Sequence, residues 1–193
     1  HMAKKNENGY LSAKESRRIS RENRKITDQF EKLHKRKNVP EEEFLTKMHD
    51  ENNSLEIENL HTYFFSDVGT VRAVDGVSFD VPIGKTVGVV GESGCGKSVT
   101  AKSIMRLIKT PPAEIKEGSE IIFDGEDVLQ FNEKRLCAYR GGEVAMVFQD
   151  ALAALNPTMT VGNQIIENLR HHTKLSKKEA KARAVELLRM VGI

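Results

Sequence analysis

The chain has 193 residues, of which 38% are hydrophobic and 30% are charged, with a formal net charge of +2. These values indicate an ordinary globular protein with one domain, or with one domain and an appendage, and the small net charge does not by itself argue for nucleic-acid binding. No apolar run approaches the roughly 20 residues that cross a bilayer, and we expect no signal peptide. Because Cys95 and Cys137 form no CxxC pair, neither a disulfide framework nor a zinc site is predicted, which favours a cytosolic compartment.

Residues 1–53 are polar and rich in charge, and we predict that they form a charged helical extension. His1 and Met2 are interpreted as a cloning scar. Ser12 and Glu15 have the spacing of a capping box and so predict a helix start. An apolar stripe follows at helical spacing, with residues on one face at Ile19, Ile26, Phe30 and Leu33.

Three interpretations of this extension stay open. It is a solvated appendage, it docks its apolar stripe on its own domain or a partner, or it binds anionic lipid headgroups. No nucleic-acid partner is predicted, because the stripe contains one aromatic residue and acidic residues are interspersed among the basic ones. Pro40 and the acidic residues 41–43 predict the first turn of a second short helix. Residues 50–53 are predicted to be a linker.

From Ser54 the sequence changes to short β-type runs and glycines. Partly alternating patterns predict strands over 55–65, 77–81 and 120–123. Two nearly continuous apolar runs predict strands that are buried on both faces of a parallel sheet, over 85–90 and 144–148. Helices are predicted over 97–107, 132–140, 161–169 and 177–190, the last opened by a capping box of Ser176 and Glu179. The order of elements predicts an α/β domain.

The segment 91–98, Gly-Glu-Ser-Gly-Cys-Gly-Lys-Ser, fits the phosphate-loop pattern G-x-x-x-x-G-K-[ST] between a predicted strand and a predicted helix. Its glycines Gly91, Gly94 and Gly96 allow the loop to fold tightly with several backbone N–H groups turned inward. The start of the following helix adds its positive end at the same place. These features predict a binding site for the phosphates of a nucleotide.

Side chains complete this predicted site. The Lys97 ammonium is expected to reach the β- and γ-phosphates, a contact worth about 1.5–3 kcal/mol. The Ser98 hydroxyl is expected to bind Mg²⁺, whose other ligands are mostly phosphate oxygens and water. We therefore predict ATP and Mg²⁺ as cofactors, with the remaining contacts from Ser93, Cys95 and Val99.

The regions that flank this loop resemble the ATPase subunits of ATP-binding-cassette (ABC) transporters, in particular oligopeptide and dipeptide importers. The resemblance covers about residues 55–193 and is carried by three stretches: Ala73 to Phe79, Val87 to Thr100, and Val147 to Gly162, which contains Leu155-Asn156-Pro157. It implies a P-loop NTPase (RecA-like) core with an ABC-type antiparallel β part over 54–193. The start of the helical subdomain is expected from about residue 150.

The resemblance also implies roles for two more residues. Gln149 stands where the family has its Q-loop glutamine, which reaches the Mg²⁺ region, so it is expected to act in catalysis with Lys97. Phe64 stands where the family stacks an aromatic ring on adenine. Tyr63 and Phe65 are alternatives, because neighbouring residues of a strand face opposite ways.

Several elements that complete the family's site are expected to follow Ile193. They are the signature motif, the acidic strand end and the switch histidine. Catalysis of phosphoryl transfer depends on such positioned charges, so we expect these 193 residues to bind ATP without turning it over. Without the strands that are expected after Ile193, apolar faces of this segment would stay exposed to water.

The function implied by the resemblance is that of an ATPase coupling ATP hydrolysis to peptide uptake. Its expected partners are two transmembrane permease subunits, a second ATPase subunit and, indirectly, an extracytoplasmic solute-binding protein. Its expected place is the cytoplasmic face of the cell membrane, as a peripheral protein. The alternatives are the motor of a nickel or other small-solute importer, a non-transport ABC ATPase, and a scaffold that senses nucleotide.

Overall fold

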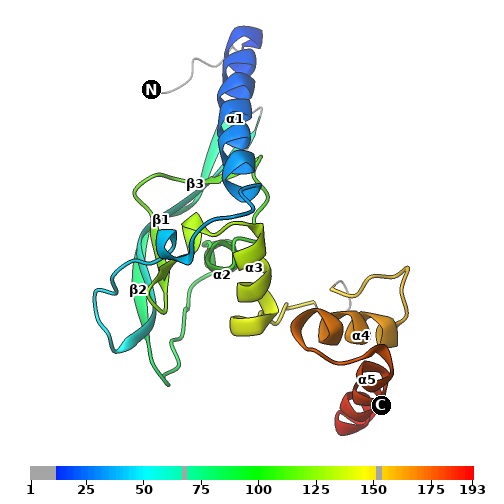
Figure 1. The fold of residues 1–193 in the computed structure, drawn as a ribbon. Helices are drawn as coiled ribbons and strands as arrows, with labels where there is room; N and C mark the ends of the chain where they lie inside the picture. Colours follow the sequence, from blue (N-terminus) through cyan, green and yellow to red (C-terminus); the bar gives the residue numbers. More distant parts are fainter. Residues whose placement is uncertain (1–11, 67–68, 151–153) are drawn as a thin grey trace. The chain divides into compact units, whose positions relative to one another are not determined.

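The computed structural model describes residues 12–66, 69–150 and 154–193 and divides the chain into two compact units, residues 1–135 and 136–193 (Figure 1). The first unit contains helices α1 (Ala13–His34), α2 (Lys97–Ile104) and the start of α3 (Glu133–Ala138), with 3₁₀ turns at Glu41–Glu43 and Val128–Gln130. The second contains α4 (Val161–His172) and α5 (Lys177–Met190). Among the described residues, no helix is both long and apolar enough to cross a membrane.

An antiparallel sheet forms the centre of the first unit. Its strands are β1 (Asn53–Ser66), β2 (Gly69–Pro82), β3 (Ala113–Ile115), β4 (Glu120–Phe123) and β5 (Glu126–Asp127). The order is β2-β1-β4-β5, and β3 pairs with the other end of β1. The strands predicted over 55–65, 77–81 and 120–123 are confirmed, and β2 begins earlier than predicted.

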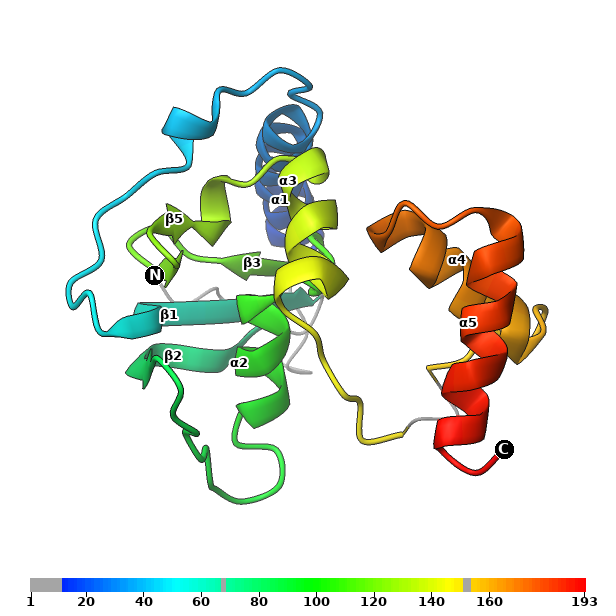
Figure 2. The ribbon, with the colours of Figure 1, turned by 60° about the horizontal axis from the view of Figure 1, so that its bottom comes forward.

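Helix α2 packs on one face of the β1–β2 hairpin (Figure 2). The hydroxyl groups of Thr62 on β1 and Ser103 on α2 are hydrogen-bonded at 2.8 Å, and both residues are fully buried. The α2 helix ends at Ile104, three residues before the predicted end, because Arg106 has a left-handed backbone with φ of 49°. The packed helix therefore holds the segment before it, which contains the phosphate loop, close to the sheet.

The segment before β1 also packs against the sheet. The Phe44 side chain is only 3% exposed, and its ring meets that of Phe131 edge-on with 5.5 Å between centroids. The Thr46 N–H donates to the Gly125 carbonyl, and the Asp127 N–H donates to that of Phe44. Phe44 is thus part of the core of this unit, and backbone hydrogen bonds tie residues 44–46 to the edge of the sheet.

The predicted N-terminal helix is confirmed as α1. The Ser12 hydroxyl accepts a hydrogen bond from the Glu15 N–H, while the Glu15 carboxylate accepts one from the Ser12 N–H, so the capping box is present. The predicted apolar stripe lies outside the side chains that the structure describes, at Ile19, Ile26, Phe30 and Leu33. The short helix predicted after Pro40 forms as a single 3₁₀ turn.

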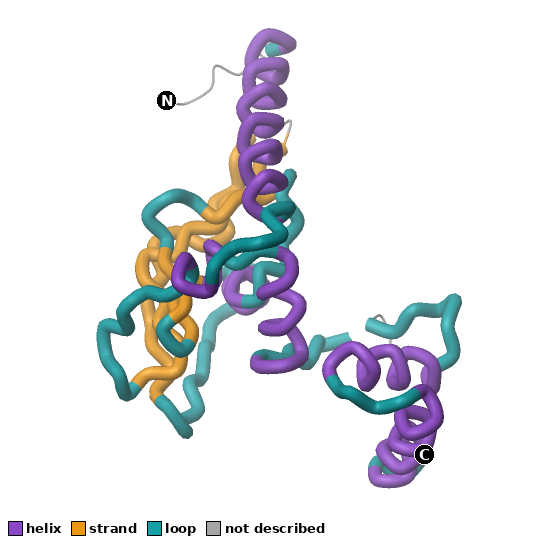
Figure 3. Tube along the Cα trace, in the orientation of Figure 1, coloured by secondary structure: helices purple, strands orange, loops and turns teal. Residues whose placement is uncertain are grey.

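The two buried parallel strands predicted over 85–90 and 144–148 are wrong. Both segments are loops (Figure 3), apart from a bridge between Val144 and Arg140. Val90 is 91% exposed and Val147 is 97% exposed. A central parallel strand forms only with a hydrogen-bonding neighbour and with cover on both faces, and the described residues of each unit supply neither.

In the second unit, the predicted helices over 161–169 and 177–190 are confirmed as α4 and α5. The α5 helix opens with the capping box of Ser176 and Glu179. The predicted helix over 132–140 forms as α3 over Glu133–Ala138, and the chain then kinks at Arg140 and Gly141, whose backbone angles are not helical. The φ of Gly141 is 85°, which a residue with a side chain rarely adopts.

Candidate nucleotide-binding site

The candidate site is built on the loop 91–96 and the first turn of α2, both in the first unit. Gly94 and Gly96 have left-handed backbones, with φ of 83° and 95°. A Cβ atom on Gly96 would lie 2.3 Å from the carbonyl oxygen of Ala73, and one on Gly91 would lie 2.7 Å from the Cys95 sulfur. Glycine is therefore required at Gly96 both by its conformation and by its contact with β2.

The Lys97 side chain turns back over this loop. Its Nζ donates hydrogen bonds to the carbonyl oxygens of Gly91 and Glu92, each at 2.7 Å, and lies 3.5 Å from the Cys95 sulfur. The first N–H groups of α2 have no partner inside the helix, and the positive end of the helix dipole lies there. A cation, helix N–H groups and a glycine-rich backbone in one place fit the phosphates of a nucleotide.

A magnesium ion fits this site only together with phosphates. Ser98 is exposed in the first turn of α2 and offers one hydroxyl oxygen. In the part of the chain that the structure describes, no group of three His, Cys, Asp or Glu side chains is placed to hold a metal ion. Mg²⁺ binds in just this way, through one or two protein oxygens with phosphate and water completing its shell.

The remaining predicted contacts of the loop lie in the same short segment. Ser93 and Cys95 are exposed, and Val99 is half-buried in α2. The Thr100 N–H and hydroxyl both donate to the Gly96 carbonyl, at 2.8 and 3.1 Å. These bonds close the first turn of α2 directly after the loop.

The three aromatic residues of β1 lie near the turn end of the β1–β2 hairpin, where β3 pairs with β1. Phe64 is half-buried and pairs with Val71 on β2 and Ala113 on β3. The Arg72 guanidinium lies over the Tyr63 ring, 5.4 Å from its centroid, and Lys116 lies 5.7 Å from that of Phe65. Cations therefore already contact Tyr63 and Phe65.

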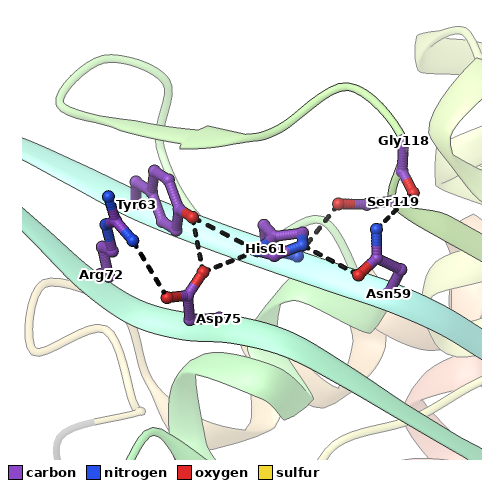
Figure 4. Close-up of polar contacts among 7 residues, drawn as sticks. All are labelled: Asn59, His61, Tyr63, Arg72, Asp75, Gly118 and Ser119. Carbon is purple, nitrogen blue, oxygen red and sulfur yellow. Dashed lines mark hydrogen bonds and ion pairs between the residues drawn. The ribbon is translucent and has the colours of Figure 1, made fainter. Parts of the chain in front are cut away.

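A polar cluster that sequence analysis missed fixes the Tyr63 side chain (Figure 4). The Tyr63 hydroxyl donates to Asp75 Oδ1 at 2.5 Å, and His61 Nδ1 lies 2.8 Å from the same oxygen. His61 Nε2 lies 3.0 Å from Asn59 Oδ1.

The hydrogen bonds from Tyr63 and His61 hold the pKa of Asp75 below its usual range. The bond to Asp75 raises the pKa of Tyr63. The only sequence signal was the polar residues at alternate positions 59, 61 and 63.

Gln149 belongs to the second unit. It is exposed at a bend after the segment 144–148, where the predicted strand does not form. The phosphate loop belongs to the first unit, so an action of Gln149 on that loop stays a prediction.

The sequence model of the ABC transporter family matches residues 74–193, which include the phosphate loop and Gln149. This match covers more than half of the chain, and the chain therefore belongs to the ABC transporter family. The predicted class of protein is confirmed.

The chain is also similar in sequence to proteins of peptide transport. The chain is 49% identical over 138 residues to the oligopeptide transport ATP-binding protein AppD of Bacillus subtilis, covering 72% of this chain and 42% of AppD. It is 50% identical over 139 residues to OppD of the same organism, an oligopeptide transport ATP-binding protein, covering 72% and 38%. The chain thus spans about two-fifths of the length of these relatives.

A solved structure supports the fold. The dimeric structure of MJ0796, a bacterial ABC transporter cassette, is similar with a TM-score of 0.59 and 24% identity, covering 70% of this chain and 56% of MJ0796. The antiparallel sheet with its packed α2 helix is thus the fold of an ABC cassette, and the predicted fold class is confirmed.

Proposed function

We propose that this chain provides the ATP-binding part of an importer subunit that couples ATP hydrolysis to peptide uptake. The observation that carries the proposal is the loop 91–98, in which Gly96 is docked on Ala73 and Lys97 covers the loop. The names of AppD and OppD favour peptides as the transported solute over nickel. The partners in this proposal are two permease subunits, with a solute-binding protein acting through them, and a second ATPase subunit. In this proposal, the subunit is located at the cytoplasmic face of the membrane.

In this proposal, each part of the loop has a separate task. Backbone N–H groups of the loop and of α2 bind phosphate oxygens, and Lys97 releases the carbonyls of Gly91 and Glu92 to bind the terminal phosphates. Ser98 supplies a magnesium ligand, and Mg²⁺ when bound neutralises charge on the phosphates. Gln149 is proposed to act on the bound Mg²⁺, as the position of the family's Q-loop glutamine implies.

The adenine ring is proposed to stack on Phe64. Its neighbours Tyr63 and Phe65 are each in contact with a cationic side chain, Arg72 and Lys116. Base stacking on an aromatic ring is worth roughly 1–3 kcal/mol. Phe64→Ala is therefore expected to weaken ATP binding about tenfold, with Phe65→Ala as the control.

Isothermal calorimetry with MgATP on the full chain tests the proposed function. Lys97→Ala is expected to weaken binding by at least tenfold, since it removes a contact worth about 1.5–3 kcal/mol. Lys102→Ala is the matched control, because Lys102 is exposed and lies in the last turn of the same helix. Equal affinities of the two variants, or binding that does not depend on magnesium, would overturn the proposal.

A further inference from the structure

Positive charge in this chain is concentrated before the cassette. Residues 1–37 contain 12 Lys or Arg against 5 Asp or Glu, whereas residues 38–193 contain 18 against 23. The small net charge of the whole chain therefore hides a basic N-terminal segment joined to an acidic remainder. The helix α1 carries most of that basic segment.

The cations of α1 form one continuous face. Positions 14, 17, 21 and 24 are separated by three or four residues and so lie along one side of a helix, and positions 18, 25 and 32 form the adjacent row. All seven side chains are exposed: Lys14, Arg17, Arg18, Arg21, Arg24, Lys25 and Lys32. From the first to the last, this face is about 27 Å long.

Few acidic groups neutralise this face. Among the described side chains of α1, Arg18 forms an ion pair with Glu22, with 3.8 Å between Nε and Oε1. Both groups of this pair are exposed. Among the side chains of α1 that the structure describes, Asp28 is the exposed acid in line with the basic rows. Exposed pairs of this kind contribute little to stability, so the basic face is not explained by helix stabilisation.

We propose that the basic face of α1 binds the anionic headgroups of a membrane surface. A straight row of exposed cations matches a flat anionic surface, and each Lys or Arg near such a surface increases binding about fivefold. This inference uses the membrane location in the proposed function to choose lipid over nucleic acid as the anionic partner. The heptad positions 19, 26 and 33 lie on the other side of the helix, so binding is electrostatic and does not require insertion.

The test uses the full chain and sedimentation with vesicles of phosphatidylcholine, with or without phosphatidylglycerol. The triple variant Arg17→Gln, Arg21→Gln and Arg24→Gln is expected to bind the anionic vesicles on the order of a hundredfold more weakly. Glutamine keeps a high helix propensity, and circular dichroism checks that α1 persists. The matched control removes three exposed cations elsewhere, by Lys102→Gln, Lys134→Gln and Lys178→Gln, and is expected to bind as the unaltered chain does.

Binding that requires phosphatidylglycerol, decreases with salt and is lost only in the α1 variant supports the proposal. Absence of vesicle binding, or equal loss in the control, overturns it. Tighter binding to a single-stranded RNA than to the vesicles also overturns it, in favour of a nucleic-acid partner. MgATP affinity is measured on the same samples, so a failure here is distinguishable from a failure of the proposed function.

Discussion

Gly96 lies where the phosphate loop meets the sheet, with no room for a side chain beside the Ala73 carbonyl. Gly96→Ala is expected to destabilise the first unit by about 1–3 kcal/mol, from backbone strain and this contact together, and to abolish MgATP binding. Gly84→Ala is the control, because Gly84 also has positive φ, 69°, but nothing lies within 4 Å of its added Cβ. Urea denaturation and calorimetry measure the two effects. Equal losses in both variants would show that the approach to Ala73 is unimportant.

A single residue, Glu56, makes the stability of the first unit depend on pH. Burial of its carboxylate, which is 1% exposed, acts to raise its pKa. Hydrogen bonds from the His49 and Asp50 N–H groups, at 2.7 Å each, and from Asn53 outweigh burial, so the pKa of Glu56 is lowered. Its stabilising contribution is therefore present above the unfolded pKa of roughly 4.3 and is lost as the pH falls through the folded value.

The measurement is the free energy of unfolding as a function of pH. Glu56→Gln is expected to cost about 1–3 kcal/mol at neutral pH, because the His49 and Asp50 N–H groups lose a charged acceptor, and to flatten the acid side of the profile. Glu58→Gln, at an exposed position of the same strand, is expected to leave the profile unchanged. A profile for Glu56→Gln as steep as that of the unaltered chain would assign the acid dependence to other carboxylates.

At the scale of elements, Phe44 shows that the segment before β1 contributes to the core. Phe44→Ala is expected to destabilise the first unit by about 3–5 kcal/mol, because it removes a buried ring that packs on Phe131. Leu45→Ala is the control at the next residue, where the side chain is 64% exposed. Urea unfolding measures the stability of both variants. A decrease below about 1 kcal/mol in the free energy of unfolding for Phe44→Ala would show that the segment contributes little to the core.

Local signals in the sequence predicted many elements correctly. The caps at Ser12 and Ser176 and the glycine at Gly141 act within a few residues, so a short window contains the information. The apolar runs 85–90 and 144–148 are different, because pairing with a distant neighbour decides whether such a run becomes a strand. The core position of Phe44 was missed for the same reason, since its partner Phe131 is remote in sequence.

The same distinction applies to the candidate site. The motif predicted the glycines and Lys97, because a phosphate loop uses fixed residue types at fixed spacing. It did not predict that Gly96 contacts Ala73, nor that Asp75 fixes Tyr63. The contact of Asp75 with Tyr63 depends on the register of β2 beside β1, which alternation alone does not determine. The approach of Gly96 to Ala73 depends on where α2 packs on the hairpin.

At the scale of the whole molecule, large apolar side chains are exposed in both units. Val90→Gln and Val147→Gln are therefore expected to change the free energy of unfolding by less than about 0.5 kcal/mol and to reduce self-association. Urea denaturation and sedimentation velocity measure these quantities. Leu60→Gln, at a fully buried position, is the control that should unfold the first unit. A loss of several kcal/mol for either valine would show that its segment is covered in solution.

The approach of Gly96 to Ala73 has a mechanical consequence. Because the start of α2 lies against the main chain of β2 with no room for a side chain between them, β2 opposes a movement of the phosphate loop toward it. A push exerted by a bound triphosphate would therefore travel into the hairpin that carries Phe64, so both ends of a nucleotide would be sensed by the same pair of strands.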